Sequence, residues 1–259
     1  MIVAPGMTEK LALECINLTK RFGGLEAVNR INLQVKVGER RAILGPNGAG
    51  KTTFFRLISG EFQATSGSIR YFGRDISHMA CHRRTHLGLG RTFQITNLFP
   101  TLTVFDNLIL AAMGLKKTKF SMLRPLSTYP NLQERAMELL EMMGMTDRRG
   151  ETVKNLSHGE QREIEIALAL ISNPKVLLLD EPTAGLSPAE SAMITHTVQK
   201  LDPSITILII EHDMDVAFSI ADRITVLHQG CLFAEGSLAE IRENRRVQEI
   251  YFGTEEKPC

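Results

Sequence analysis

The stretch GPNGAGKT, Gly45 to Thr52, constrains the fold of this chain more than any other segment. It matches the phosphate-loop pattern GxxxxGK(S/T), and it lies between RRAIL, which is typical of a strand, and FFRLISG, which is typical of a helix. In such a loop, glycines let backbone N–H groups surround a phosphate at a helix N-terminus. We expect Lys51 to reach the β- and γ-phosphate oxygens and the Thr52 hydroxyl to bind Mg²⁺. The sequence therefore predicts a strand–loop–helix unit that binds a nucleoside triphosphate.

The segments around this loop predict an α/β fold with a β-rich start. Residues 11–22 and 28–44 alternate apolar and polar side chains as strands do, and residues 67–76 supply another strand. Residues 131–144 have apolar positions at helical spacing, whereas residues 114–130 have little pattern and are interpreted as a solvated face. From residue 159, helices alternate with the apolar strands KVLLLD, ITILIIE and RITVLHQG before a charged tail. This alternation is typical of a parallel sheet covered on both faces.

Composition and charge exclude several classes of protein. The formal net charge is +1, from 30 Lys and Arg against 29 Asp and Glu, so no basic field indicates a nucleic-acid partner. The 4 cysteines are scattered without a CxxC pair or a Cys/His cluster, which argues against a disulfide framework and a metal cage. The N-terminus lacks a secretory signal pattern, and the longest apolar runs are far shorter than the roughly 20 residues that cross a bilayer. We therefore expect reduced thiols and, for any work at a membrane, a partner that spans it.

Two adjacent carboxylates, Asp180 and Glu181, end the apolar strand VLLLDE. Open α/β sheets bind their ligands at the carboxyl ends of strands. Because successive side chains on a strand point to opposite sides, we assign the two residues different roles. Asp180 is predicted to belong to the Mg²⁺ shell, and Glu181 is predicted to orient and polarise the attacking water. The alternative is a pair of ordinary acids at a strand end.

Three more residues are candidates for the same site. His212 follows the buried strand ITILII, and this position favours a hydrogen bond to the γ-phosphate or to the water over a purely structural role. Gln94 stands between a short apolar run and a loop, where its amide is predicted to reach Mg²⁺ or water. Phe22 is either a ring that stacks on a base or a core side chain, and the sequence leaves both readings open.

A helix is predicted to begin at Ser157, in the stretch NLSHGEQREIEIALAL. Ser157 and Glu160 form the pattern of a capping box, which satisfies donors within the chain. The box does not account for Gly159, whose missing side chain lets another group approach the backbone. Since the phosphate loop already holds one triphosphate, we interpret this helix end as a second, free anion site that faces the nucleotide of another copy. The protein would then close as a two-fold dimer around two nucleotides.

These motifs stand in one order, and from about Leu11 to Gly253 the chain resembles the ATP-binding subunit of ABC transporters. The resemblance implies that Phe22 stacks on adenine, that Gln94 is the Q-loop glutamine and a Mg²⁺ ligand, and that His212 is the switch histidine. It also identifies LSHGE as the signature, LLLDE as the Walker B strand and TAGLSP as the D-loop. The residues expected to bind ATP are Phe22, Gly45, Pro46, Asn47, Gly48, Ala49, Gly50, Lys51, Thr52 and Thr53, and those expected to act in trans are Ser157, His158, Gly159 and Glu160.

The signature departs from the usual LSGGQ at His158 and Glu160. It keeps Ser157 and Gly159, the groups that the resemblance places against the phosphate. The two changes therefore leave ATP binding intact and affect only its fine tuning.

The same resemblance implies a fold and a division into subdomains. The expected fold is an α/β P-loop NTPase core of mostly parallel sheet with flanking helices, an N-terminal antiparallel β subdomain and an inserted helical subdomain. One ABC ATPase domain is expected over residues 11–253, with tails at 1–10 and 254–259. Within it, residues 11–93 and 160–253 would form the β subdomain and the RecA-like core, and residues 95–159 the helical signature subdomain.

Within that family, three stretches look like the subunit of branched-chain amino-acid importers: GLGRTFQITNLFPTLTVFDNLILAA, LSHGEQREIEIALAL and the ending RVQEIYFG. Urea importer subunits and the lipopolysaccharide-export ATPase share some of these patterns and remain alternatives. The resemblance implies an ATP-hydrolysing subunit on the cytoplasmic face of the inner membrane, bound to membrane permease subunits. The dimer would pair two copies, or one copy with a second ATP-binding subunit, and a periplasmic solute-binding protein is expected in the complex.

Two other classes of function fit the sequence less well. Soluble ABC ATPases that act on DNA or ribosomes usually join two cassettes or insert a long coiled coil, and this sequence has neither. Its near-neutral charge also argues against a nucleic-acid surface. A GTP switch protein needs an NKxD-like guanine reader after a later strand, which this sequence lacks.

Overall fold

The computed structural model describes residues 10–92, 98–114 and 130–252 of the 259-residue chain. The role predicted for Gln94, and most of segment 114–130, therefore lie outside the described residues. The strands are β1 (Leu11–Phe22), β2 (Leu25–Lys36), β3 (Arg40–Leu44), β4 (Ser66–Tyr71), β5 (Arg74–Asp75), β6 (Leu89–Arg91), β7 (Val176–Asp180), β8 (Thr206–Ile210), β9 (Arg223–His228) and β10 (Cys231–Ser237). The helices are α1 (Lys51–Ser59), α2 (Cys81–His86), α3 (Val104–Gly114), α4 (Pro130–Met142), α5 (His158–Leu170), α6 (Pro188–Gln199), α7 (Met214–Ile220), α8 (Leu238–Glu243) and α9 (Arg245–Phe252), with 3₁₀ turns η2 (Thr146–Arg148) and η3 (Val153–Asn155).

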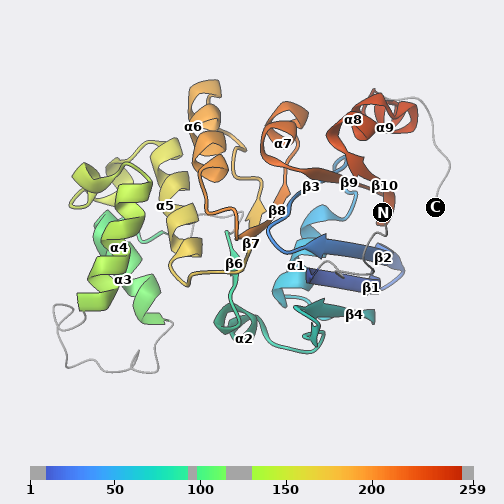
Figure 1. The fold of residues 1–259 in the computed structure, drawn as a ribbon, viewed down its shortest axis with the longest axis horizontal. Coiled ribbons are helices and arrows are strands. Elements are labelled where there is room, and N and C mark those ends of the chain that lie inside the picture. The colour runs from blue at the N-terminus through green and yellow to red at the C-terminus, as the bar shows by residue number, and fades with distance from the viewer. Residues whose placement is uncertain (1–9, 93–97, 115–129, 253–259) are drawn as a thin grey trace, which may run out of the picture.

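Two sheets organise the molecule (Figure 1). The first has the order β2-β1-β4-β5 and is antiparallel throughout. The second has the order β10-β9-β3-β8-β7-β6, in which only the edge strand β10 runs antiparallel to its neighbour. The predicted β-rich start and mostly parallel core are both confirmed.

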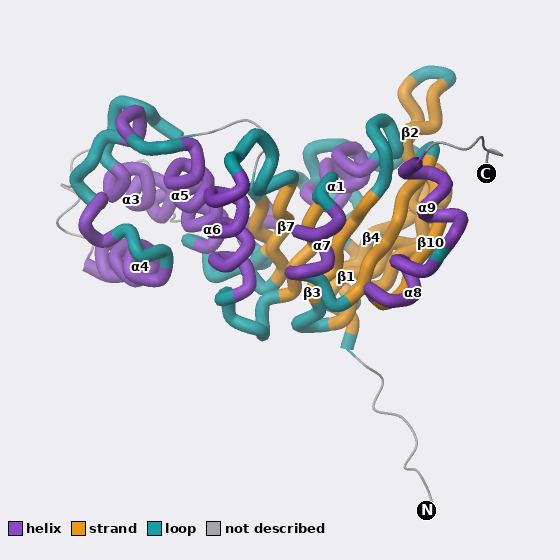
Figure 2. Tube along the Cα trace, turned by 90° about the horizontal axis from the view of Figure 1, so that it is seen from above, coloured by secondary structure: helices purple, strands orange, loops and turns teal. Residues whose placement is uncertain are grey.

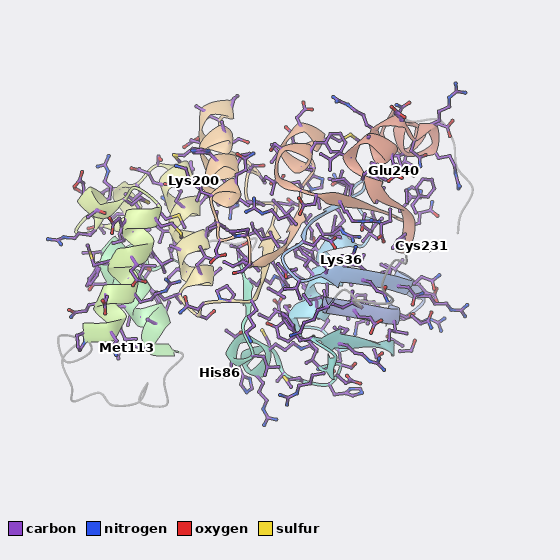
Figure 3. The ribbon with its side chains drawn as sticks, in the orientation of Figure 1. Lys36, His86, Met113, Lys200, Cys231 and Glu240 are labelled. Carbon is purple, nitrogen blue, oxygen red and sulfur yellow. The ribbon has the colours of Figure 1, made fainter. Side chains whose placement is uncertain are left out.

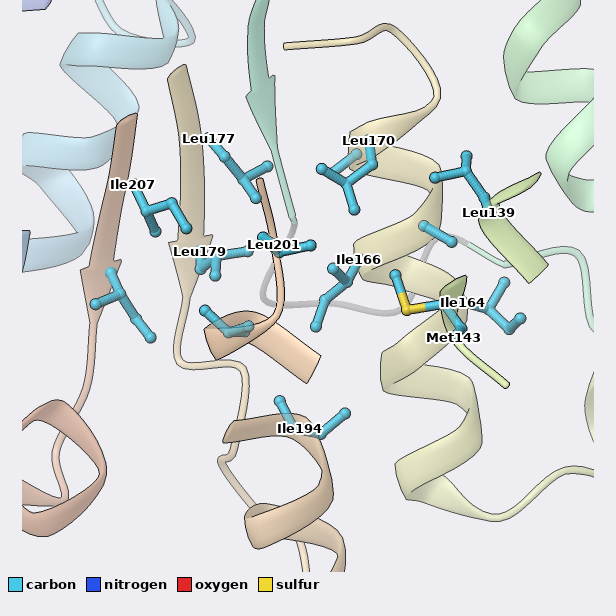
Figure 4. Close-up of a cluster of buried hydrophobic side chains, with 14 of the residues drawn as sticks. Leu139, Met143, Ile164, Ile166, Leu170, Leu177, Leu179, Ile194, Leu201 and Ile207 are labelled. Atoms are coloured by element: carbon cyan, nitrogen blue, oxygen red, sulfur yellow. The ribbon is translucent and has the colours of Figure 1, made fainter. Parts of the chain in front are cut away.

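The central strands β7 and β8 are buried on both faces because their residues alternate between two hydrophobic clusters. Leu177 and Leu179 of β7 belong to the cluster under α5 and α6, where Figure 4 shows them beside Ile166 and Leu170 of α5. Their neighbours Val176 and Leu178 belong to the other cluster, together with residues of α1 and of the antiparallel sheet. Strands buried in this way read as unbroken apolar runs, which is the pattern seen in the sequence.

The helices α3, α4 and α5 lie together at one end of the molecule, away from the antiparallel sheet (Figures 1 and 2). Leu139 and Met143 pack near Ile164 of α5, in the same cluster that reaches β7 (Figure 4). The helical group is thus joined to the sheet through α5, and the predicted boundary near residue 159 stays a prediction. In the described part of the chain, none of the helices is long and apolar enough to cross a bilayer.

The C-terminal stretch that the sequence marked only as charged is folded. β10 begins at Cys231 and pairs with β9, and α8, which contains Glu240, and α9 follow (Figure 3). Ile241 and Val247 are buried, with 2% and 1% of their surface exposed, and they anchor these helices on the core. In α8 and α9 the apolar positions stand among charged residues, which is why the pattern did not reveal these two helices.

Candidate nucleotide-binding site

The phosphate loop connects β3 to α1, as predicted, and its lysine is turned onto the loop itself. The Lys51 ammonium donates to the carbonyl oxygens of Gly45 at 2.6 Å and Pro46 at 3.0 Å. Burial lowers the pKa of Lys51, while the nearby carboxylates of Glu181 and Asp180 oppose that shift. The cation is therefore held inside the loop, next to the two carboxylates that the sequence assigned to the same site.

Two glycines of this loop lie directly against other backbone. Gly45 has a φ of +150°, and a Cβ there would lie 2.2 Å from the carbonyl oxygen of Leu227. Gly50 has a φ of +98°, and a Cβ there would lie 2.3 Å from the carbonyl oxygen of Ala27. Both positions therefore require glycine.

The first turn of α1 differs from those of α5, α6 and α8. No side chain caps it, and it contains no acidic residue. By contrast, α5, α6 and α8 each begin with a complete capping box. Uncapped N–H groups at a helix N-terminus attract an anion, so the start of α1 suits a phosphate.

The loop opens onto a hollow of about 680 Å³ that also contains Glu181 and His212. Its lining residues are Leu25, Glu26, Ala27, Asn47, Gly48, Ala49, Gly50, Lys51, Thr52, Thr53, Glu181, His212, Gln229 and Gly230. Sequence reasoning missed the first three, at the turn into β2, and the last two. Gln229 and Gly230 follow β9, so the rule that ligands lie at the carboxyl ends of strands would have found them.

Phe22 lies outside the lining of this hollow. Its ring packs edge-on against Phe62 with 5.4 Å between the ring centroids, and the Lys20 ammonium lies 5.0 Å from its centre. The ring is still 44% exposed, beside the turn that leads to Leu25. Stacking on adenine therefore stays a prediction.

Asp180 is bound by an arginine that the sequence analysis did not single out. Its Oδ2 accepts from Nη2 of Arg91 at 2.9 Å, and Arg91 also donates to Ser59 and Glu61. Burial raises the pKa of Asp180, and the Arg91 guanidinium opposes the shift. The other carboxylate oxygen, Oδ1, is buried and has no hydrogen-bond partner among the described residues. Mg²⁺ prefers oxygen ligands, so the unpartnered Oδ1 fits a ligand of the predicted ion. Thr52 lines the hollow, whereas Asp180 is not among its lining residues.

Glu181 stands just beyond β7, which corrects the argument from strand alternation. Its φ is +50°, a left-handed conformation that is uncommon outside glycine, and its N–H donates to the carbonyl oxygen of Ile210 at 3.0 Å. The two carboxylates still have different partners, because Asp180 contacts Arg91 whereas Glu181 contacts His212. Oε1 of Glu181 lies 2.6 Å from Nε2 of His212, a contact that the sequence analysis did not predict. The hydrogen bond predicted from His212 to the γ-phosphate or the water stays a prediction.

Glu211 is a buried carboxylate beside this pair that sequence reasoning passed over. It is 2% exposed, and its Oε1 accepts from the Thr183 hydroxyl at 2.9 Å and from the Thr183 N–H at 3.3 Å. Burial raises its pKa to about 7, against the effect of these hydrogen bonds. It ties the start of the His212 segment to the segment after Glu181.

Glu211→Gln is expected to stabilise the protein at pH 8 by about 1–3 kcal/mol, because the buried charge is removed while Oε1 still accepts from Thr183. The pKa of Glu211 is about 7 in the folded protein and ordinarily 4.5, so the stability that this group contributes is complete below pH 4.5 and is lost as the pH rises through 7. Urea unfolding should show the variant's advantage shrinking to less than about 1 kcal/mol at pH 5. The exposed Glu141→Gln serves as the control, and an advantage of Glu211→Gln that does not change with pH would contradict the assignment.

The predicted capping box at the start of α5 is confirmed. The Ser157 N–H donates to Glu160 Oε2 at 2.8 Å, and the Glu160 N–H donates to the Ser157 hydroxyl at 3.2 Å. The Gly159 N–H is not free in this structure, because it donates to Oε1 of Glu190 at 3.0 Å. The predicted contact of this helix end with another copy's nucleotide stays a prediction. Ser157 and His158 are exposed, and none of residues 157–160 lines the hollow at the phosphate loop.

Comparisons with known proteins agree with these features. The family model for the ABC transporter matches residues 28–184, and the model for the branched-chain amino acid ATP-binding cassette transporter matches residues 231–257. The chain is 39% identical to the high-affinity branched-chain amino acid transport ATP-binding protein BraF of Pseudomonas aeruginosa over 93% of this chain and 97% of the relative. It is 38% identical to LivG of Salmonella typhimurium over 91% and 95%, and 35% identical to the lipopolysaccharide export system ATP-binding protein LptB of Escherichia coli over 92% and 95%.

Solved structures are similar as well. The ADP conformation of MJ1267, an ATP-binding cassette of an ABC transporter, has a TM-score of 0.83 and 29% identity over 94% of this chain and 99% of that one. The dimeric post-hydrolysis state of the cassette MJ0796, bound to ADP and Pi, has a TM-score of 0.74 and 28% identity over 87% and 98%.

Proposed function

Because the chain belongs to the ABC transporter family and is a transport ATPase, we propose that it powers the uptake of branched-chain or related amino acids. Two findings support this solute class: the C-terminal family model and the names of the relatives BraF and LivG. The similarity to LptB keeps lipopolysaccharide export as the second candidate.

The proposed working unit is a dimer that buries two ATP molecules. One observation carries it: the hollow of a single copy contains the phosphate loop, Glu181 and His212, but the exposed end of α5 at Ser157 is not part of it. A two-fold partner can bring its own α5 to that hollow, and the arrangement is then repeated at the second nucleotide. The partner is a second copy or a related ATP-binding subunit.

Within each half-site, the residues of this chain have separate tasks. Lys51 would exchange the loop carbonyls for phosphate oxygens, and the N–H groups of the first turn of α1 would bind the same anion. Thr52 and Asp180 would hold Mg²⁺, which neutralises charge on the phosphates when bound. Glu181 would orient the attacking water and accept its proton, while His212 holds the Glu181 carboxylate in place. Gln94 remains a predicted ligand of the ion or the water.

The dimer is proposed to act on membrane permease subunits from the cytoplasmic face of the inner membrane, as a peripheral subunit. A periplasmic solute-binding protein would deliver the amino acid to the permeases. ATP binding closes the dimer and hydrolysis releases it, and a change from 1:99 to 99:1 closed requires roughly 5.5 kcal/mol of differential binding. The movement would pass to the permeases through the region from Gln94 to Tyr129, of which the structure describes residues 98–114.

Analytical ultracentrifugation of Glu181→Gln tests the dimer, since slow hydrolysis leaves ATP in place. We expect monomer without nucleotide and dimer with Mg²⁺ and ATP, and we expect dilution to reverse the association. Adding Ser157→Ala should raise the ATP concentration at half-association by at least about tenfold, because each site loses a hydrogen bond to a charged phosphate. Ser237→Ala removes the equivalent cap of α8 and should change nothing. A protein that stays monomeric at every ATP concentration would refute the proposal.

A further inference from the structure

We propose that Glu190 is a positioning residue of the signature: its carboxylate occupies the Gly159 amide in the open subunit and must leave before a second subunit's triphosphate can bind there. This inference rests on the dimer proposed above. The inference adds a residue, Glu190, that competes with the nucleotide for the Gly159 N–H. None of the predicted motifs contains Glu190.

The contact joins the first turns of two helices that pack side by side, α5 and α6 (Figure 1). Oε1 of Glu190 accepts from the Gly159 N–H at 3.0 Å. Oε2 accepts from the Ser187 N–H at 3.0 Å and from the Ser187 hydroxyl at 2.7 Å. One carboxylate therefore completes the capping box of α6 and at the same time takes a donor at the N-terminus of α5.

The carboxylate is charged at neutral pH. Hydrogen bonds from the Ser187 side chain, from the Gly159 amide and from the Ser187 amide lower the pKa of Glu190 below its usual value, with a smaller contribution from His158. A charged acceptor binds an N–H roughly twice as strongly as a neutral one. Glu190 thus supplies, from within the chain, the negative charge that the end of α5 attracts.

An incoming phosphate cannot share this donor with Glu190. Gly159 is buried and has a single N–H, and a Cβ at Gly159 would lie 2.8 Å from Cγ of Glu190 and 3.1 Å from Cε of Met193. The side chains of α6 therefore cover the Gly159 backbone closely. Two anions at one N–H would also repel each other. Binding of the triphosphate requires that Glu190 withdraw.

Withdrawal of Glu190 would be felt at the catalytic carboxylate. Ser187, the residue that Glu190 holds, ends the segment that runs back through Thr183 to Glu181. Thr183 is itself fixed by Glu211, next to His212. The segment from Glu181 to Ser187 is thus held at one end by Glu190. Withdrawal of Glu190 from Gly159 would loosen that end, while the other end is Glu181, the residue proposed to orient the water.

Glu190→Gln in the Glu181→Gln background tests the competition, because glutamine keeps the capping-box pattern and removes the charge. We expect the Mg²⁺–ATP concentration at half-association, measured by ultracentrifugation, to fall by about threefold to tenfold. Glu240→Gln is the matched control: Glu240 forms the same box with Ser237 at the start of α8, remote from α5 (Figure 3). It should leave the midpoint unchanged.

A midpoint that stays the same or rises in Glu190→Gln would overturn the inference. If Glu181→Gln alone never associates, the proposed dimer itself is refuted. The two results therefore separate a failure of the dimer from a failure of the Glu190 inference. A second readout needs no nucleotide: the amide proton of Gly159 in NMR spectra of the monomer should move upfield in Glu190→Gln and stay in place in Glu240→Gln. An unmoved Gly159 amide would show that the carboxylate does not bind it.

Discussion

Glu181→Gln is expected to slow ATP hydrolysis by about 10²–10⁴-fold, since the amide cannot accept the proton of the attacking water. The residue stands at a left-handed φ of +50°, between the end of β7 and His212, whose Nε2 lies 2.6 Å from its Oε1. Strained backbone of this kind persists where the surroundings fix it, and it is concentrated at functional sites. The left-handed backbone and the His212 contact together hold Glu181, which lines the hollow.

Release of phosphate at saturating ATP measures this effect. Glu243→Gln, at the end of α8, is the control and should keep the wild-type rate. Equilibrium binding of ATP should be retained in Glu181→Gln, because Lys51 and the first turn of α1 are unchanged. Hydrolysis within about threefold of wild type would show that another group positions the water.

Arg91→Ala is expected to lower the free energy of unfolding by about 3–5 kcal/mol, the usual cost of leaving a buried charge without its partner. The side chains of Arg91 and Asp180 are 6% and 0% exposed, and their charged atoms lie 2.9 Å apart. Arg91 also joins β6 to the end of α1 through Ser59 and Glu61. The loss of Arg91 would therefore leave the buried Asp180 without its partner and would remove the link between β6 and α1.

Urea unfolding of the nucleotide-free protein measures the loss. Arg56→Ala provides the comparison, because Arg56 pairs with the same Glu61 at 3.8 Å but is 41% exposed. Exposed ion pairs contribute about 0–1 kcal/mol, so this variant should stay close to wild type. If the two variants lost equal stability, the buried pair would not be the anchor that its geometry indicates.

The sequence predicted the parts of the site whose chemistry depends on a local pattern. The phosphate loop, the apolar strand before Asp180, the strand before His212 and the capping box at Ser157 all lie where they were expected. Each is specified by residues close together in the chain, so spacing and residue type were enough. The membership in the ABC transporter family rested on the order of these patterns and is confirmed.

Contacts between distant segments could not be predicted in this way. Arg91 meets Asp180 across 89 positions, and Glu190 meets Gly159 across 31. Glu190 stands in none of the predicted motifs, and Glu211, which precedes His212 at the end of its strand, was given no role. The contacts of both residues depend on how distant segments of the chain pack. The left-handed backbone at Glu181 could not be predicted either, because an apolar strand pattern does not locate the end of the strand to within one residue.

The alternation of β7 between two hydrophobic clusters ties turnover to both halves of the interior. The strand that ends at Asp180, just before Glu181, packs against α5 and α6 on one face and against α1 and the antiparallel sheet on the other. A substitution that creates a cavity on either face of β7 would let Asp180 and Glu181 move relative to the phosphate loop. Heat sensitivity and slow turnover should therefore appear together in core variants, including those far from any bound nucleotide.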